Sequence, residues 1–216
     1  DNVGLQIDTV REIDKVALAL EINLDTWEII SDQHYDLIIT HHPLIFKPIY
    51  HLGFEDWNHV VFRELITSGC GLYVSHTNLD RASVSVTDAL LRQFEFDSSN
   101  VSELHDGYGR VIKLNKPVDI FDIEDKVPII LKVIPDELKI NTIAFLGGSG
   151  KSFIKEVVKQ GIDLFITGEL GYHDIQYLRQ QKVGVILLGH YQSESFVLDV
   201  IKTRLNHLEL EVDIIK

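Results

Sequence analysis

Short, uninterrupted apolar runs alternate with helix-like stretches along almost the whole chain, and this alternation limits the fold more than any other feature. The strongest of these runs are residues 16–21, 36–40, 72–75, 142–146, 163–167 and 183–188. Such runs are typical of strands that are covered on both faces, as in parallel sheets. Helical spacing of apolar residues predicts the intervening helices at residues 24–33, 58–68, 85–94, 152–160, 173–181 and 193–205. We therefore expect an α/β fold with largely parallel or mixed sheets.

The alternation weakens in the middle of the chain, where the sequence contains more Pro, Gly and charged residues. We expect residues 98–139 to be a connecting segment with short strands near 110–114 and 129–133. It joins an N-terminal α/β half at residues 1–97 to a C-terminal α/β half at residues 140–216. We interpret the two halves as parts of one domain rather than as independent domains.

Composition excludes several classes of partner. The 216 residues have a formal net charge of −13 and a pI of about 5.1, which argues against nucleic acid or anionic membrane as a partner. Cys70 is the single cysteine, so an internal disulfide is impossible and a reducing compartment is favoured. No run approaches the roughly 18 apolar residues of a membrane span, and no signal peptide is evident. Cytoplasm is the expected location.

Histidines and carboxylates follow three of the apolar runs. These residues are His41 and His42 after the run 36–40, His76 and Asp80 after 72–75, and His190 and Glu194 after 183–188. In open α/β sheets, ligands bind beyond the carboxyl ends of the strands. Three such segments at one edge are hard to attribute to chance. We therefore predict a metal site at the carboxyl ends of the strands, between the two halves.

The spacing of these residues suggests how they share metal ions. Adjacent side chains in a regular strand point to opposite faces, so His41 and His42 suit two different ions better than one. Pro43 favours an extended conformation of the preceding His42. His190 and Glu194 are separated by four residues at a predicted helix start and would reach the same point. Imidazole and carboxylate ligands without thiolate suit Zn, Mn, Fe or Ni.

Other polar residues allow more than one interpretation. Glu169 and His173, near another strand end, could be an acid/base pair beside the metals or a solvated helix start. Taken alone, His76 is better explained as a hydrogen-bonded residue. The segment Gly147–Gly150 lacks the glycine spacing of a nucleotide-hydrolase loop, although it could cradle an anion or simply form a tight turn. Cys70 has no evident activating base and is expected to be buried.

The chain resembles the GTP cyclohydrolase I type 2 homologue family, also called the NGG-one-interacting-factor-three-like proteins. The resemblance is carried by an ordered set of segments that spans nearly the whole chain. These segments are residues 1–6 (Asp-Asn-Val-Gly-Leu-Gln), 36–43, 76–80, 147–150, 167–169 with His173, and 189–190 with Glu194. Members of the family usually carry a helix before the first of these segments, and its absence here suggests truncation or disorder.

The resemblance implies a dinuclear metal centre with two divalent ions per chain. By motif position, His42 and Asp80 would hold one ion, His41 and His190 would hold the other, and Glu194 would bridge them. It also implies a homohexameric, ring-like assembly with the sites facing an internal cavity. Longer members insert a further domain in mid-chain, for which the middle of this chain is too short.

Three functions remain open at this point. The leading hypothesis is a two-metal hydrolase, of the GTP cyclohydrolase or phosphoesterase type, acting on a small nucleotide- or pterin-like substrate. In that case Glu169, His173 or His76 would transfer protons. The second hypothesis is a metal-binding regulatory or metal-handling protein without catalysis, and the third is a protein-interaction scaffold.

Overall fold

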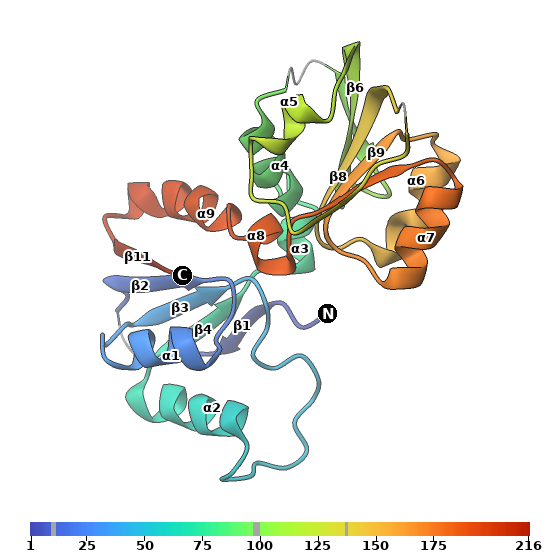
Figure 1. The fold of residues 1–216 in the computed structure, drawn as a ribbon. Coiled ribbons are helices and arrows are strands. Elements are labelled where there is room, and N and C mark those ends of the chain that lie inside the picture. The colour runs from blue at the N-terminus through green and yellow to red at the C-terminus, as the bar shows by residue number, and fades with distance from the viewer. Residues whose placement is uncertain (10–11, 97–99, 137) are drawn as a thin grey trace. The chain divides into compact units, whose positions relative to one another are not determined.

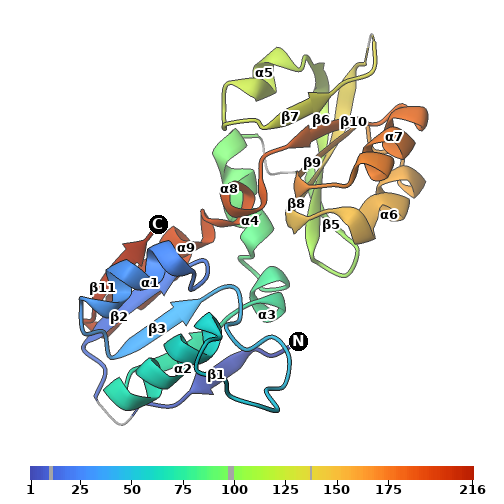
Figure 2. The same ribbon diagram turned by 60° about the horizontal axis from the view of Figure 1, so that its bottom comes forward.

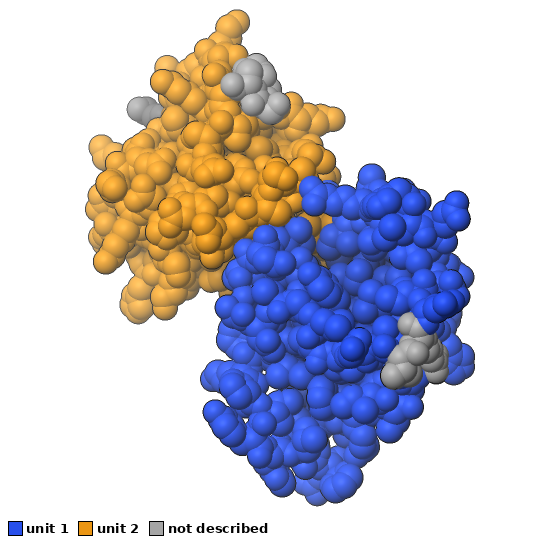
Figure 3. All heavy atoms as spheres, turned by 180° about the vertical axis from the view of Figure 1, so that it is seen from behind, with its two compact units in different colours: residues 1–79, 198–216 blue, residues 80–197 orange. Residues whose placement is uncertain are grey.

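The computed structural model describes residues 1–9, 12–96, 100–136 and 138–216, which form two compact units. Unit 1 contains residues 1–79 and 198–216, and unit 2 contains residues 80–197 (Figure 3). The halves expected from the sequence group the elements differently, since the C-terminal residues belong to unit 1. The expected boundary at residue 97 lies outside the described residues.

A five-stranded mixed sheet forms the centre of unit 1, with the strand order β1-β4-β3-β2-β11 (Figure 1). Its strands are β1 (Gly4–Ile7), β2 (Lys15–Ala19), β3 (Leu37–Thr40), β4 (Gly71–Val74) and β11 (Glu211–Ile215). The last four are parallel to one another, and β1 pairs antiparallel with β4. The carboxyl ends of β2, β3 and β4 therefore lie at one edge of the sheet.

Helices cover both faces of this first sheet. They are α1 (Leu24–Ser31), α2 (Trp57–Ser68) and α9 (Val197–Leu205), with a 3-10 turn, η4 (Asn206–Leu208), after α9. Ala17 and Ala19 of β2 belong to the core formed with α1 and α2, whereas Val16 and Leu18 pack with Leu198 of α9. Alternate residues of one strand thus serve two cores, which explains the uninterrupted apolar run.

A six-stranded mixed sheet forms the centre of unit 2, with the strand order β5-β6-β8-β9-β10-β7. Its strands are β5 (Val101–Leu104), β6 (Gly109–Val118), β7 (Leu131–Val133), β8 (Ile140–Ser149), β9 (Leu164–Glu169) and β10 (Gly184–Leu187). Strands β8, β9 and β10 are parallel, and the other pairings are antiparallel. The carboxyl ends of the three parallel strands again share one edge.

Helices also cover both faces of the second sheet (Figure 2). The helical elements whose bounds lie wholly within the described residues between 77 and 194 are α3 (Thr77–Asp80), α4 (Val86–Leu91), η1 (Arg92–Phe94), α5 (Phe121–Glu124), η3 (Lys151–Phe153), α6 (Ile154–Lys159), α7 (Tyr172–Gln180) and α8 (His190–Glu194). Helices α6 and α7 pack on the face that carries Phe165, and α4 and α5 pack on the face that carries Phe145 and Ile166.

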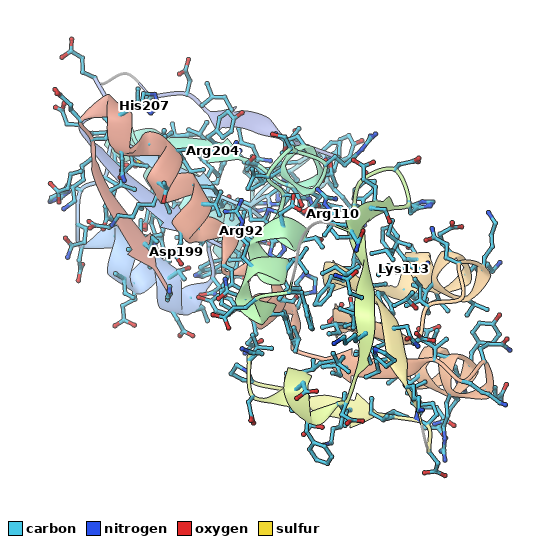
Figure 4. All side chains as sticks on the ribbon, turned by 90° about the horizontal axis from the view of Figure 1, so that it is seen from above. Arg92, Arg110, Lys113, Asp199, Arg204 and His207 are labelled. Carbon is cyan, nitrogen blue, oxygen red and sulfur yellow. The ribbon has the colours of Figure 1, made fainter. Side chains whose placement is uncertain are left out.

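A buried ion pair attaches α4 to the second sheet. Arg110 of β6 lies beside α4 (Figure 4) and binds Asp88 through Nε–Oδ1 at 2.8 Å and Nη2–Oδ2 at 2.7 Å. Its Nη1 donates to the carbonyl oxygens of Gly107 and Gly109 at 2.7 and 3.0 Å. A buried guanidinium is tolerated when it is paired and hydrogen-bonded in this way. The pair therefore fixes the helix against which α8 packs.

The two sheets use the same device to set strand register. An aspartate precedes the second parallel strand in each: Asp36 before β3, and Asp163 before β9. Asp36 Oδ2 accepts two successive backbone N–H groups that lead into β2, at 3.1 and 3.0 Å. Asp163 Oδ2 accepts two near the start of β8, those of Asn141 and Thr142, at 2.8 and 2.9 Å. These bonds align the strands, and hence the residues that follow their carboxyl ends.

The α/β class with mixed sheets, predicted from the sequence, is confirmed. Cys70 is buried, as expected. The helix expected at residues 193–205 is divided into α8, which already begins at His190, and α9. Among the described residues, none of the helices has the length and apolar character that a membrane crossing requires.

We expect Tyr35→Phe to lower the free energy of unfolding by about 1 kcal/mol, because the Tyr35 hydroxyl donates to Asp213 Oδ2 at 3.0 Å. Burial, followed by the hydrogen bond and charge of Asp213, raises the pKa of Tyr35 to about 12. The contribution of this hydrogen bond to the free energy of unfolding is therefore fully present below pH 10 and is lost as the pH rises through 12. Urea unfolding at about pH 8 and about pH 11 measures it. A difference between wild type and variant that does not shrink at the higher pH would contradict this account.

Candidate metal centre

The regular pairing of β3 ends at two adjacent histidines. Successive backbone N–H groups of a strand normally point to opposite sides, but those of His41 and His42 both donate to the carbonyl of Leu20, at 3.1 and 2.7 Å. The Thr40 hydroxyl donates to the His42 carbonyl at 2.8 Å and stabilises the bend. The alternation of side chains is therefore broken here, and the two rings lie with centroids 5.1 Å apart.

Hydrogen bonds define which ring nitrogen of these histidines can bind a metal. His41 Nδ1 lies 2.8 Å from the carbonyl oxygen of Ser75, and His42 Nδ1 lies 3.0 Å from Glu21 Oε2. Because a carbonyl or carboxylate oxygen can only accept, both Nδ1 atoms must donate. In the neutral imidazole the lone pair is then on Nε2. Metal-binding histidines usually carry such an acceptor on their other nitrogen.

His76 has the same arrangement. Its Nδ1 is hydrogen-bonded to the carboxylate of Asp1, which also accepts from the Thr77 hydroxyl at 2.6 Å. The His76 ring lies 5.0 Å from that of His41 and 5.5 Å from that of His42. One ring nitrogen from each of the three histidines lies within 4.8 Å of the others. Unit 1 thus gathers three oriented imidazoles at the carboxyl ends of β3 and β4.

The first segment of the chain holds the loops around these histidines. Asp1 contacts the segment after β4, as described above. Asn2 and Gln6 donate their side-chain amides to the Ile45 carbonyl at 2.7 and 3.0 Å, and Gln6 Oε1 accepts from the Ile45 N–H at 3.1 Å. The segment therefore ties down the chain that leaves His42 as well as the chain that contains His76.

Unit 2 presents a second group of candidate ligands on α8, beyond the carboxyl end of β10. His190 Nε2 lies 3.3 Å from Glu194 Oε2, and His190 Nδ1 lies 3.3 Å from Glu169 Oε1 at the end of β9. Glu194 is buried, whereas Glu169 is exposed. The spacing of four residues on one helix brings His190 and Glu194 together, as predicted.

Gly148 leaves the space that the Glu194 carboxylate occupies. A Cβ at position 148 would lie 2.1 Å from Glu194 Oε1 and 3.3 Å from His190 Nε2, and the φ angle of +66° also favours glycine. The cradle thus holds one carboxylate and one imidazole side by side. Donors of these two kinds fit a borderline divalent metal such as Zn²⁺, Mn²⁺, Fe²⁺ or Ni²⁺.

The two carboxylates change the protonation of His190. The hydrogen bond with Glu194 is the largest influence and raises the pKa of His190 to about 9, although burial opposes the rise. The charge of Glu194, and then the hydrogen bond and charge of Glu169, add to it. In the metal-free chain, the resulting contribution to stability is complete below pH 6.5 and is lost as the pH rises through about 9. A metal ion that binds His190 at neutral pH must therefore displace a proton.

Asp80 and His173 are the remaining predicted site residues. Asp80 is half-buried at the end of α3, four residues after His76. His173 is exposed on α7, with its ring edge-on to Tyr172 at 5.3 Å. In the described part of the chain, His173 forms no hydrogen bond or ion pair with Glu169. Glu169 contacts His190, and the role of Glu169 and His173 in proton transfer stays a prediction.

Sequence reasoning missed the residues that orient the ligands. Glu21 is the last residue of the run 16–21, and this position at a strand end is a signal that could have identified it. The Ser75 carbonyl is a backbone group with no sequence signal. Asp1 was seen only as part of a motif, because its contact with His76 joins residues 75 positions apart.

The chain matches one protein family over its whole length. The family described as Duf34/NIF3 (NGG1p interacting factor 3) matches residues 1–216. A Methanocaldococcus jannaschii protein named "GTP cyclohydrolase 1 type 2 homolog" is 30% identical over 226 residues, covering 98% of this chain and 89% of the relative. "NGG1-interacting factor 3" of Saccharomyces cerevisiae is 28% identical over 237 residues, covering 94% of this chain and 82% of the relative.

Solved structures show the same fold. The structure described as "Reduced HcgD from Methanocaldococcus jannaschii" has a TM-score of 0.87 and 29% identity, covering 100% of this chain and 89% of that chain. A Thermus thermophilus structure has a TM-score of 0.82 at 20% identity, covering 100% of this chain and 88% of that one, and shows the fold alone.

We expect Glu194→Gln to lower the pKa of His190 in the metal-free protein from about 9 toward its ordinary value of 6.5. Glu169→Gln serves as the matched comparison and should lower it less, because Glu194 makes the larger contribution. A pH titration of the histidine ring protons by NMR measures both shifts. An equal or larger decrease in the Glu169 variant would contradict the assignment.

Proposed function

The chain belongs to the Duf34/NIF3 family, and we propose that it binds two divalent metal ions. The proposed ligands are His41, His42, Asp80, His190 and Glu194. By family resemblance, His42 and Asp80 would hold one ion and His41 and His190 would hold the other, with Glu194 as a ligand of both. Zn, Mn, Fe and Ni all suit this set of imidazoles and carboxylates.

The orientation of the imidazoles supports this proposal most strongly. His41 and His42 each donate from Nδ1 to a fixed acceptor, so the same nitrogen, Nε2, is left to bind in both rings. His41 is fully buried, and the Ser75 carbonyl fixes the orientation of its ring through Nδ1. Histidines that served only the fold would not require this shared orientation.

We further propose that the protein is a metal-dependent hydrolase acting on a small nucleotide- or pterin-like substrate. Relatives that carry the name "GTP cyclohydrolase 1 type 2 homolog" support this class. When bound, two such ions supply an activated water and stabilise developing negative charge. Among the chain's own residues, His76, Glu169 and His173 are the proposed proton-transfer groups. Asp1 would hold the His76 ring in place through Nδ1.

One observation favours a second function, that of a metal-handling protein without catalysis. In the metal-free chain, His190 and Glu194 form an ion pair 3.3 Å apart, and Glu169 adds a second contact to His190. The ligands of unit 2 therefore satisfy one another when no ion is bound. Such a pair can release and take up an ion without leaving a buried charge alone.

We also propose that the protein forms a homo-oligomer, a hexamer by family resemblance. The loop at residues 43–54 supports self-association, because it exposes several large apolar side chains. These are Phe46, Ile49, Tyr50, Leu52 and Phe54. The loop contains Lys47 and no acidic residue, whereas the chain as a whole has 33 acidic residues. An apolar loop of this kind suits the acidic surface of a second copy better than solvent.

Metal content tests the proposed ligands. After dialysis against zinc, we expect two ions per wild-type chain by elemental analysis, and less than one ion in the variant His41→Ala/Glu194→Ala, because each ion loses a ligand. His207→Ala is the matched control: His207 lies in η4, the turn that follows α9 (Figure 4), is exposed, and is not a proposed ligand. Two retained ions in the double variant would contradict the proposal.

Turnover separates the two functions. We expect the zinc-loaded wild type to hydrolyse GTP or another member of a panel of nucleotides and pterin triphosphates, and the His41→Ala/Glu194→Ala variant to lose this activity. The same activity in both proteins would contradict the hydrolase. Stoichiometric zinc with no turnover on the whole panel would support metal handling instead.

Substitutions in the loop at residues 43–54 test self-association. We expect Tyr50→Asp/Leu52→Asp to lower the molar mass measured by light scattering, because Tyr50 is 94% exposed and Leu52 is 55% exposed in the single chain. Phe121→Asp introduces a charge at a 74% exposed aromatic residue of unit 2 and is the control. A monomeric wild type, or an unchanged mass in the loop variant, would contradict the proposed interface.

A further inference from the structure

Ser193 joins α8 to the glycine segment at the end of β8. It lies between His190 and Glu194 in the helix and is fully buried. Its Oγ accepts from the backbone N–H of Gly148 at 2.9 Å and donates to the carbonyl of His190 at 2.8 Å. The Ser193 hydroxyl therefore links Gly148 to the backbone of His190.

The same glycine is held from the other side. Thr167, also fully buried, donates its hydroxyl to the Gly148 carbonyl at 3.1 Å. A Cβ at Gly168 would lie 2.5 Å from Ser193 Oγ and 2.6 Å from the Gly148 carbonyl oxygen. The contact between the strand ends and α8 is thus closely packed as well as hydrogen-bonded, and side chains larger than hydrogen are excluded.

Helix α8 needs such a support. It has only five residues, and the residue before it, Gly189, provides no side-chain hydrogen bond to cap it. A helix this short is not stable by itself, because nucleation costs more than its few internal bonds return. Its direction, and with it the separation of the His190 and Glu194 side chains, must come from contacts with the rest of the unit.

We propose that Ser193 and Gly148 are positioning residues that hold His190 and Glu194 in the geometry that binds metal before any ion arrives. Gly148 supplies the space for the carboxylate, and Ser193 connects that glycine to the helix. This inference rests on the proposed metal-binding function. It adds that affinity depends on two residues that do not touch the ion, as is common for the groups surrounding metal ligands.

Zinc affinity, measured by competition with a chromophoric chelator, tests the inference. We expect Ser193→Ala to weaken zinc binding by about 10-fold or more, the effect typical of losing a group that orients a ligand. Ser195→Ala removes a hydroxyl two residues further along, which makes no hydrogen bond to another described residue, and should bind zinc like the wild type. Gly148→Ala should weaken binding at least as much as Ser193→Ala.

The same substitution in a variant that lacks both ligands distinguishes a positioning role from a general destabilisation of the fold. In the variant His190→Ala/Glu194→Ala there is nothing left for Ser193 to position, so adding Ser193→Ala should leave the remaining zinc affinity unchanged. The effect of Ser193→Ala on the midpoint of thermal unfolding of the metal-free protein should be present both with and without His190 and Glu194. If Ser193→Ala does not fold, as judged by circular dichroism, Gly148→Ala serves in the same comparison.

The outcomes are distinct. An equal loss of zinc affinity in both backgrounds, or no loss in the wild-type background, would overturn the inference while leaving the proposed metal site intact. A wild-type chain that binds no zinc would overturn the proposed function and this inference together. Loss confined to the background that retains His190 and Glu194 would support it.

Discussion

Parallel strand pairing is the constraint on which the candidate metal centre depends. In unit 1, β3 and β4 are parallel and aligned, so the residues that follow them, His41, His42 and His76, meet at one edge. In unit 2, β9 and β10 are parallel, so Glu169 and His190 meet in the same way. Asp36 and Asp163, at the opposite ends of the strands, set the strand register on which this convergence depends in each unit.

Hydrogen bonds to Nδ1 turn this convergence into a metal-binding geometry. Without them, each imidazole could rotate or exchange tautomers, and the lone pairs would have no common direction. The acceptors are the carbonyl of Ser75 and the carboxylates of Glu21 and Asp1. Unit 2 has a different arrangement, in which His190 is held between two carboxylates and carries a proton. A cation that binds His190 at neutral pH must therefore displace a proton from it.

The sequence was sufficient to predict most strands, the α/β class and the placement of the histidines, because these follow from local periodicity and from the run that precedes each histidine. The place of β11 in the sheet could not be predicted, because β11 is the last strand of the chain and its partner β2 is near the beginning. The roles of Glu21, Asp1 and Ser193 were missed for the same reason: each acts through one long-range contact. The bend at His41 and His42 was not predicted, because it depends on the Leu20 carbonyl that both backbone N–H groups share.

The central claim is that the adjacent histidines serve two different ions. An anomalous-difference map from crystals of the zinc-loaded protein tests it most directly. We expect two peaks per chain, with His41 bound to one and His42 to the other, and Glu194 bound to both. A single peak bound by His41 and His42 together would contradict it.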